Sequence, residues 1–264
     1  MKIAILSDIH GNISALEPVL ADLERQGNAD HVVVTGDMFA FGPAPAQVLA
    51  RLGQLPHTHF LMGNTDRYLL ERTYPSLRSG GDWQDQLLLS FHWTAEQLGN
   101  KGFDFLKSLA PFSVIQDKRR QLLAVHGSPR SDEEGLTIQT AASEFEHMAV
   151  DPRVRVVVCG HTHVPMDRTL GNVRVVNAGS VGIPFDGDPR ACYALISNVA
   201  GNGCGPTQVE LRRVAYDVEE AVAQLYERHH PAADIGAYNL RTARSIGSHL
   251  IYTPEMRHRQ RFPR

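Results

Sequence analysis

Side chains able to bind metal ions recur in this sequence, each time directly after a short apolar stretch and often beside a glycine. Five segments have this form, at residues 8–10, 36–37, 63–64, 126–127 and 160–163. The seven donor residues are Asp8, His10, Asp37, Asn64, His126, His161 and His163. Such a mixture of nitrogen and oxygen donors suits divalent transition metals. Seven donors exceed the needs of one ion, so the set indicates two ions that share a ligand.

Each segment taken alone has an ordinary structural explanation. A histidine after a strand is commonly a surface residue, and Gly-Asp after a strand is commonly a turn. The repetition of the pattern at five places in one chain makes a metal site the better interpretation. The donor types do not choose among manganese, iron, zinc and nickel.

The elements that must position these donors alternate between strand and helix in the first part of the chain. Apolar runs at 2–6, 31–35 and 58–62 predict strands, and the spacing of apolar residues predicts helices over 14–26 and 45–52. This alternation is typical of a parallel sheet covered by helices. Ligands bind at the carboxyl ends of the strands in such sheets, so neighbouring strands would bring the donors together in one crevice.

The rest of the chain predicts further elements of both kinds. We expect helical segments at 83–109, with a break at 99–102, and at 137–149 and 217–229. The stretches "FSVIQ" and "QLLAV" predict a hairpin, and "VRVVVC" (154–159) predicts a buried strand. Short strands over 167–214 predict a second, more antiparallel sheet. From residue 230 the chain turns polar, which predicts an irregular, solvated extension. Two alternative roles for this extension are the steering of anionic substrates and packing on a second copy in a homo-oligomer.

Composition excludes several classes of protein. The chain has 264 residues, 42% of them hydrophobic, and a formal net charge of −3, so no global field attracts it to nucleic acid or membrane. No apolar run approaches the length of a membrane span, and "MKIAIL" is too short for a signal peptide. Cys159, Cys192 and Cys204 cannot all pair, which favours a reducing, cytoplasmic setting.

The order of the motifs resembles that of the calcineurin-like metallophosphoesterase superfamily. That family carries D-x-H, G-D, G-N-H-[DE], H and G-H-x-H, and this chain has "DIH", "GD", "GNTD", "HG" and "GHTH" in the same order. The stretches "GDMFAFGPAP", "HGSP" and "VVNAGSVG" are similar to a bacterial and archaeal branch described as diadenosine-tetraphosphatase-related. The resemblance covers about residues 1–215.

The resemblance implies an α/β fold, a four-layer αββα sandwich of two mixed β-sheets flanked by helices. It places the metallophosphoesterase domain at 1–229 and leaves 230–264 as a C-terminal extension. Asp8, His10 and His163 would hold one metal, and Asn64, His126 and His161 the other. Asp37 would bridge them together with a water or hydroxide that attacks phosphorus. Catalytic roles would fall to Asp37, Asn64, Thr65, Asp66 and His126.

Thr65 stands where the family motif usually has a histidine, which donates a proton to the leaving oxygen or stabilises the phosphoryl group. A hydroxyl can form a hydrogen bond, but its pKa is far too high for a general acid near neutral pH. This departure from the motif argues against the hydrolysis of esters with poor leaving groups. His92 is a candidate substitute donor, although an exposed position on a helix explains it more simply.

Three further residues are candidates for contact with the substrate. Arg67 follows the "GNTD" segment, where it could bind a phosphate or lie on a helix surface. Asn177 and Ser180, in "NAGS", resemble a family loop near the metals, although a polar turn explains them as well.

The function implied is a binuclear metal-dependent phosphodiesterase or phosphatase, which acts on a small nucleotide-like or activated phosphate ester. A phosphoprotein phosphatase or a dinucleoside polyphosphate hydrolase is the second reading, weakened by Thr65. A nuclease is the third, and the absence of a basic stripe counts against it. The non-enzyme alternative is a scaffold like the phosphoesterase-like subunit of the retromer coat. A scaffold need not keep all seven donors, so the complete set favours an enzyme.

Overall fold

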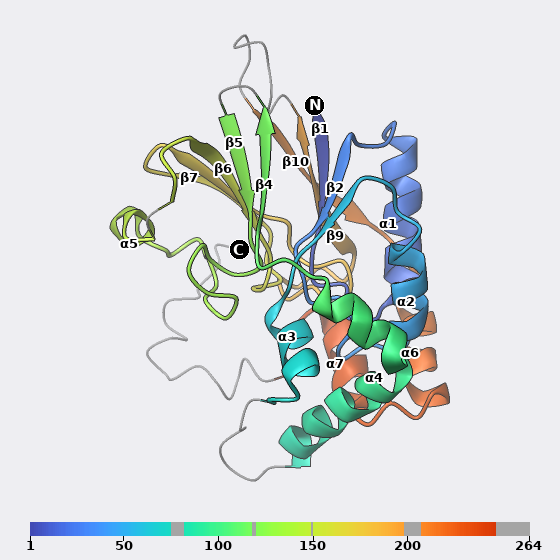
Figure 1. Cartoon of the computed structure of the whole chain (residues 1–264). Coiled ribbons are helices and arrows are strands. Elements are labelled where there is room, and N and C mark those ends of the chain that lie inside the picture. The colour runs from blue at the N-terminus through green and yellow to red at the C-terminus, as the bar shows by residue number, and fades with distance from the viewer. Residues whose placement is uncertain (75–81, 118–119, 149, 198–206, 247–264) are drawn as a thin grey trace.

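The fold is built from two five-stranded sheets packed face to face (Figure 1). A computed structural model describes residues 1–74, 82–117, 120–148, 150–197 and 207–246. The strand orders are β10-β9-β1-β2-β3 in the first sheet and β4-β5-β6-β8-β7 in the second. Parallel and antiparallel neighbours occur in both, so the predicted sandwich of two mixed sheets flanked by helices is confirmed.

The first sheet has a parallel half formed by the N-terminal part of the chain. Its strands are β1 (Lys2–Leu6), β2 (His31–Val34), β3 (Thr58–Phe60), β9 (Ala191–Ser197) and β10 (Gln208–Val214). Most described helices lie on its outer face (Figure 1): α1 (Ile13–Arg25), α2 (Pro45–Leu52), α4 (Asp82–Lys107), α6 (Val218–Glu227) and α7 (Ala233–Thr242). The predicted break in the 83–109 helix is confirmed at Gly99, whose φ and ψ are not helical.

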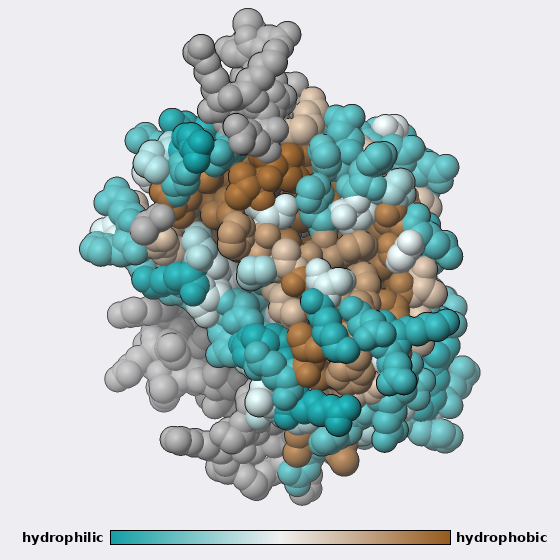
Figure 2. Space-filling view, viewed as in Figure 1, coloured by the Kyte–Doolittle hydropathy of each residue, from teal (hydrophilic) through white to brown (hydrophobic). Residues whose placement is uncertain are grey.

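The second sheet shares an apolar layer with the first and has a thinner outer cover. Its strands are β4 (Ser113–Asp117), β5 (Arg120–Ala124), β6 (Val154–Cys159), β7 (Met166–Leu170) and β8 (Val173–Asn177). Ile5 and Val33 of the first sheet meet Val158 of the second in the layer between them. The short helix α5 (Ala142–Glu146) covers part of the outer face. Val114 of β4 stays 42% exposed, and Figure 2 shows an apolar area over β4 and β5.

Two predictions for the second half of the chain are wrong. The strands within 167–214 do not form a sheet of their own, since β7 and β8 join β6 while β9 and β10 join β1. The helix predicted over 137–149 is reduced to α5, because Thr137 and Thr140 form a turn that ends before it. The Thr137 N–H donates to Thr140 Oγ1 (3.0 Å), and the Thr140 N–H donates to the Thr137 carbonyl (3.1 Å).

The irregular extension predicted from residue 230 is also wrong for Ala233–Thr242, which form helix α7. This helix packs on α6, and Gly236 permits the close approach: a Cβ there would lie 2.7 Å from Leu225 Cδ1. Residues 247–264 lie outside the described part of the chain, as does Cys204, so the predictions for them stay predictions. Cys159 and Cys192 are free and buried. Within the described ranges, no helix has the length and apolar character needed to cross a membrane.

His230 joins the start of the C-terminal segment to α4 and gives the fold a pH dependence. Its Nε2–H donates to Ser90 Oγ (3.0 Å) and its Nδ1 accepts the Ala232 N–H (3.2 Å), so the neutral ring is fully satisfied. The side chain is 3% exposed, and burial lowers its pKa from 6.5 to about 4. Because the folded pKa lies below the unfolded one, the stabilisation is complete above pH 6.5 and declines as the pH falls towards 4.

We therefore expect the stability advantage of the wild-type chain over His230→Gln to shrink on acidification, by up to about 3 kcal/mol. Urea unfolding of both proteins between pH 7.5 and 4.5 measures this difference, and groups common to both cancel. A stability difference that stays constant with pH would show that the pKa of His230 is the same in the folded and unfolded states.

Candidate metal centre

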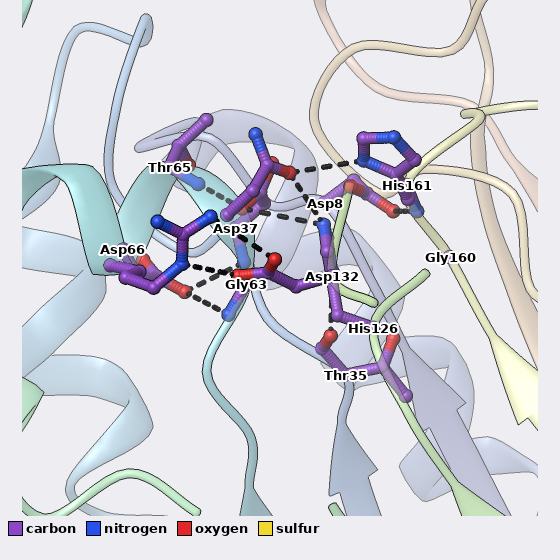
Figure 3. A network of polar contacts seen from close by, with 12 residues as sticks. Asp8, Thr35, Asp37, Gly63, Thr65, Asp66, His126, Asp132, Gly160 and His161 are labelled. Carbon is purple, nitrogen blue, oxygen red and sulfur yellow. Dashed lines mark hydrogen bonds and ion pairs between the residues drawn. The ribbon is translucent and has the colours of Figure 1, made fainter. Parts of the chain in front are cut away.

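The seven predicted donors come from the ends of strands in both sheets. Asp8 follows β1, Asp37 follows β2, and Asn64 begins helix α3 (Asn64–Glu71) just beyond β3. His126 follows β5 and His161 follows β6, in the second sheet. The strands that carry the donors are therefore not all neighbours in one sheet. The donors still meet, because the sheets pack with these strand ends together (Figure 3).

The first donor set, Asp8, His10 and His163, forms a buried group together with Asp37. Asp8, His10, Asp37 and His163 each offer one donor atom, and these atoms lie within 4.8 Å of one another. The Nε2 atoms of His10 and His163 are 3.2 Å apart, and Asp8 Oδ1 lies 3.3 Å from His163 Nε2.

The hydrogen bonds of this set leave its inward-facing atoms without donors. His10 Nδ1–H donates to the Ala40 carbonyl (2.9 Å) and His163 Nδ1–H to the Ile183 carbonyl (2.5 Å). In the neutral rings both Nε2 atoms then carry lone pairs that face each other. Asp8 Oδ1 is buried and has no hydrogen-bond partner among the described residues. Three electron-rich atoms with no proton between them fit a cation.

The pKa values of the two histidines shift in opposite directions. Burial, reinforced by His163, lowers the pKa of His10 to about 4. Burial also lowers the pKa of His163, but the neighbouring Asp8 carboxylate outweighs it and the net shift is upward. The Asp8 carboxylate therefore favours positive charge beside His163.

The second donor set converges on Asn64. Asn64 Oδ1 lies 2.9 Å from His126 Nε2 and 3.0 Å from His161 Nδ1. The other ring nitrogens donate outward, His126 Nδ1–H to the Thr35 carbonyl (2.8 Å) and His161 Nε2–H to the Glu133 carbonyl (3.0 Å). Three acceptor atoms again face one another, which fits a second cation.

Asp37 stands between the two sets. Its Oδ1 lies 3.5 Å from His126 Nε2, and its Oδ2 lies 3.8 Å from His10 Nε2. The Thr65 N–H donates to Oδ1 (2.9 Å) and fixes the carboxylate (Figure 3). Each oxygen thus faces one set, as a ligand shared by two ions requires.

The backbone of the donors is strained in a way that the sequence did not indicate. Gly11 and Gly36, the neighbours of His10 and Asp37, have a positive φ, and so do five of the donors themselves. The angles are 54° at Asp8, 48° at His10, 54° at Asp37, 66° at His161 and 57° at His163. This conformation costs a residue with a side chain roughly 1–2 kcal/mol. Strain of this kind persists where surrounding packing enforces it, and it gathers at functional sites.

Gly63 serves close packing instead. A Cβ at this position would lie 2.2 Å from Asp37 Oδ1 and 2.3 Å from the Asp37 nitrogen. A residue with a side chain would therefore displace the carboxylate between the two sets.

Asp66 positions the site but does not face it. Its oxygens accept the N–H groups of Asp37 (2.7 Å), Met38 (3.1 Å) and Gly63 (3.2 Å). Burial, followed by the charge of Asp37, raises the pKa of this carboxyl to about 8. The hydrogen bonds occupy both oxygens, which favours a positioning role for Asp66, and its catalytic role stays a prediction.

Thr65 is buried, and its hydroxyl has no hydrogen-bond partner in the described part of the chain. The candidate substitute donor, His92, is an exposed residue of α4 with its ring against Tyr74. The structure therefore does not bring His92 to the donor sets.

The predicted substrate contacts are engaged elsewhere. Asn177 is fully buried, and its amide nitrogen donates to the Gly160 carbonyl (2.6 Å). Ser180 is also fully buried and donates to the Asp8 carbonyl (2.7 Å). Both hold ligand-bearing loops, so direct contact with substrate is not supported. Arg67 forms ion pairs with Asp132 and Glu133 at 2.7 Å each.

Comparison with known proteins decides the family. The model of the calcineurin-like phosphoesterase superfamily domain matches residues 1–201. The chain belongs to this superfamily. It is therefore a phosphoester hydrolase of a metal-dependent family, and the two donor sets lie within the matched part.

Members of the calcineurin-like superfamily are similar to this chain in sequence and in structure. Phosphodiesterase YfcE of Escherichia coli K12 is 29% identical over 207 residues, which cover 75% of this chain and 88% of that protein. The metallophosphoesterase of Sphaerobacter thermophilus is 28% identical with a TM-score of 0.70, covering 92% of this chain and all of that one. A hypothetical protein, PH1004 of Pyrococcus horikoshii OT3, has a TM-score of 0.75 at 21% identity, over 92% and 99% of the two chains, and shares the fold.

Proposed function

We propose that this protein is a phosphodiesterase that uses two divalent transition metal ions to hydrolyse a small nucleotide-like or activated phosphate ester. The observation that carries the proposal is the position of Asp37, with one oxygen towards each donor set. The name of the related YfcE protein, a phosphodiesterase, supports the class of reaction.

The roles of the residues follow from their contacts. Asp8, His10 and His163 would hold one ion, Asn64, His126 and His161 the other, and Asp37 both. Ions in these positions would neutralise charge on phosphate oxygens and lower the pKa of a shared water. The outward hydrogen bonds of the histidines keep one nitrogen of each ring available and fix its direction.

Thr65 supports the preference for activated esters. A general acid typically contributes 10²–10⁴-fold to the rate, and it matters most when the leaving oxygen is strongly basic. A buried threonine hydroxyl cannot supply that proton. A diester with an acidic leaving group needs no such help, so we propose that substrates of this kind are preferred.

The test is a paired assay on metal-stripped protein, with Mn²⁺ or Zn²⁺ added back. We expect metal-dependent cleavage of bis(p-nitrophenyl) phosphate at a kcat/KM well above that of p-nitrophenyl phosphate. A monoester preference would contradict the diesterase proposal and favour a phosphatase. No turnover of either ester, with both ions bound, would favour a binding role.

A further inference from the structure

A charged loop connects the second donor set to the surface of the molecule. The loop follows His126, and its residues Asp132 and Glu133 reach Arg67 on helix α3. Arg67 Nε and Nη2 donate to the Asp132 carboxylate (2.7 and 3.1 Å), and Nη2 also donates to Glu133 Oε1 (2.7 Å). The loop is thereby fixed to the helix that begins with Asn64.

Glu133 touches a metal-binding residue through its main chain and reaches another through a tyrosine. Its carbonyl accepts the Nε2–H of His161 (3.0 Å). Its carboxylate accepts a hydrogen bond from the hydroxyl of Tyr68 (2.7 Å), and the side chain of Asn64 also interacts with that hydroxyl. The guanidinium of Arg67 lies over the Tyr68 ring, 4.9 Å from its centre. We call Arg67, Tyr68, Asp132 and Glu133 the Glu133 clamp.

The clamp fixes the direction of two donor atoms. Because the Tyr68 hydroxyl donates its hydrogen bond to Glu133, only its oxygen lone pairs are left to interact with the Asn64 amide group, which keeps Asn64 Oδ1 facing the histidines. The Glu133 carbonyl holds the proton of His161 on Nε2, which leaves the Nδ1 lone pair facing Asn64.

The first donor set is oriented differently. His10 and His163 donate to the carbonyls of Ala40 and Ile183, and both of these residues are buried. The side chains of the clamp lie nearer the surface, since Arg67 is 29% exposed and Glu133 54% exposed. A defect in the clamp should therefore affect the second set and leave the first intact.

We propose that the Glu133 clamp sets the affinity of the second metal site by orienting Asn64 and His161. The inference rests on the proposed function, because it assumes that the second donor set binds an ion. It also gives Arg67 a positioning role in place of phosphate binding.

Tyr68→Phe tests the clamp with little change of shape, since the ring keeps its packing and loses only the hydroxyl. We expect the dissociation constant of the second Mn²⁺ ion, measured by calorimetric titration of metal-stripped protein, to rise about 10–100-fold, as is usual when a residue that orients a ligand is lost. The first constant should stay unchanged. Tyr74→Phe is the matched control, because Tyr74 stacks on Phe91 in the same aromatic group without touching a donor.

Arg67→Met separates the two roles of the arginine, with Arg51→Met, which breaks the ion pair with Glu17, as its control. A clamp residue changes the second Mn²⁺ constant, whereas a phosphate ligand raises KM for the diester and leaves both constants alone. A second constant within twofold of wild type in both Tyr68→Phe and Arg67→Met would overturn the inference. A wild-type chain that binds only one ion would instead overturn the binuclear proposal, and the inference with it.

Discussion

Asp37→Asn is expected to lower kcat/KM for the diester by about 10³-fold, which corresponds to about 4 kcal/mol of lost stabilisation. The substitution removes the negative charge between the two donor sets. It also replaces one carboxylate oxygen with an amide nitrogen that cannot bind a cation. If the nitrogen takes the place of Oδ1, it meets the Thr65 N–H donor and His126; if it takes the place of Oδ2, it faces His10.

Metal analysis provides the second readout for this variant. We expect fewer than two ions per chain after removal of free metal, against two in the wild type. Asp151→Asn is the control, since Asp151 is an exposed residue paired with Arg153. Two ions retained by a folded Asp37→Asn protein of unchanged activity would show that Asp37 does not bridge.

Thr65→His is expected to raise kcat/KM for phosphomonoesters with poor leaving groups by at least about tenfold. An imidazole can donate a proton near neutral pH, and the backbone at residue 65 is already fixed beside Asp37 by its hydrogen bond (2.9 Å). The gain should increase with the pKa of the leaving group, so a series of aryl and alkyl phosphates measures it.

Thr65→Asn is the matched control for this prediction, because an amide forms hydrogen bonds but cannot act as a general acid. Thr65 is 4% exposed, so circular dichroism and metal content must first show that the larger side chain is accommodated. Equal kinetics of the histidine and asparagine variants across the series would show that a missing proton donor does not limit the reaction.

The candidate metal ligands could be found in the sequence because a strand that delivers a donor beside a glycine is a local pattern. The structure brings all seven candidates together, in two sets with Asp37 between them, while the metal roles implied by the family resemblance stay predictions. The positive φ of five of these residues could not be predicted. It accompanies backbone hydrogen bonds between separate loops, such as that from the Asp8 N–H to the Gly36 carbonyl (3.1 Å), which no single segment records.

Contacts between distant segments account for most of the errors. The sequence places β9 in a late antiparallel sheet. In the structure β9 pairs with β1, far away in the sequence, and Ile3 lies opposite Ile196. Helix α7 contains Gly236 and Asn239, which are weak helix formers, and forms because its apolar side chains pack on α6. In the sequence, Asp132 and Glu133 look like ordinary residues of a polar loop. Their role depends on contacts with Arg67 and Tyr68, which only the folded structure shows.

Because the donors come from both sheets, ions bound among them would have a mechanical role. Asp8 and Asp37 extend from one sheet and His126 and His161 from the other, so ions held among them would tether the sheets at one end of the sandwich. The sheets could not separate there without releasing metal. The free energy of unfolding would then rise with the concentration of free metal. The increase is about 2.7 kcal/mol for each site when that concentration is 100 times the dissociation constant of the site. A chelator would act on this protein as a mild denaturant as well as an inhibitor.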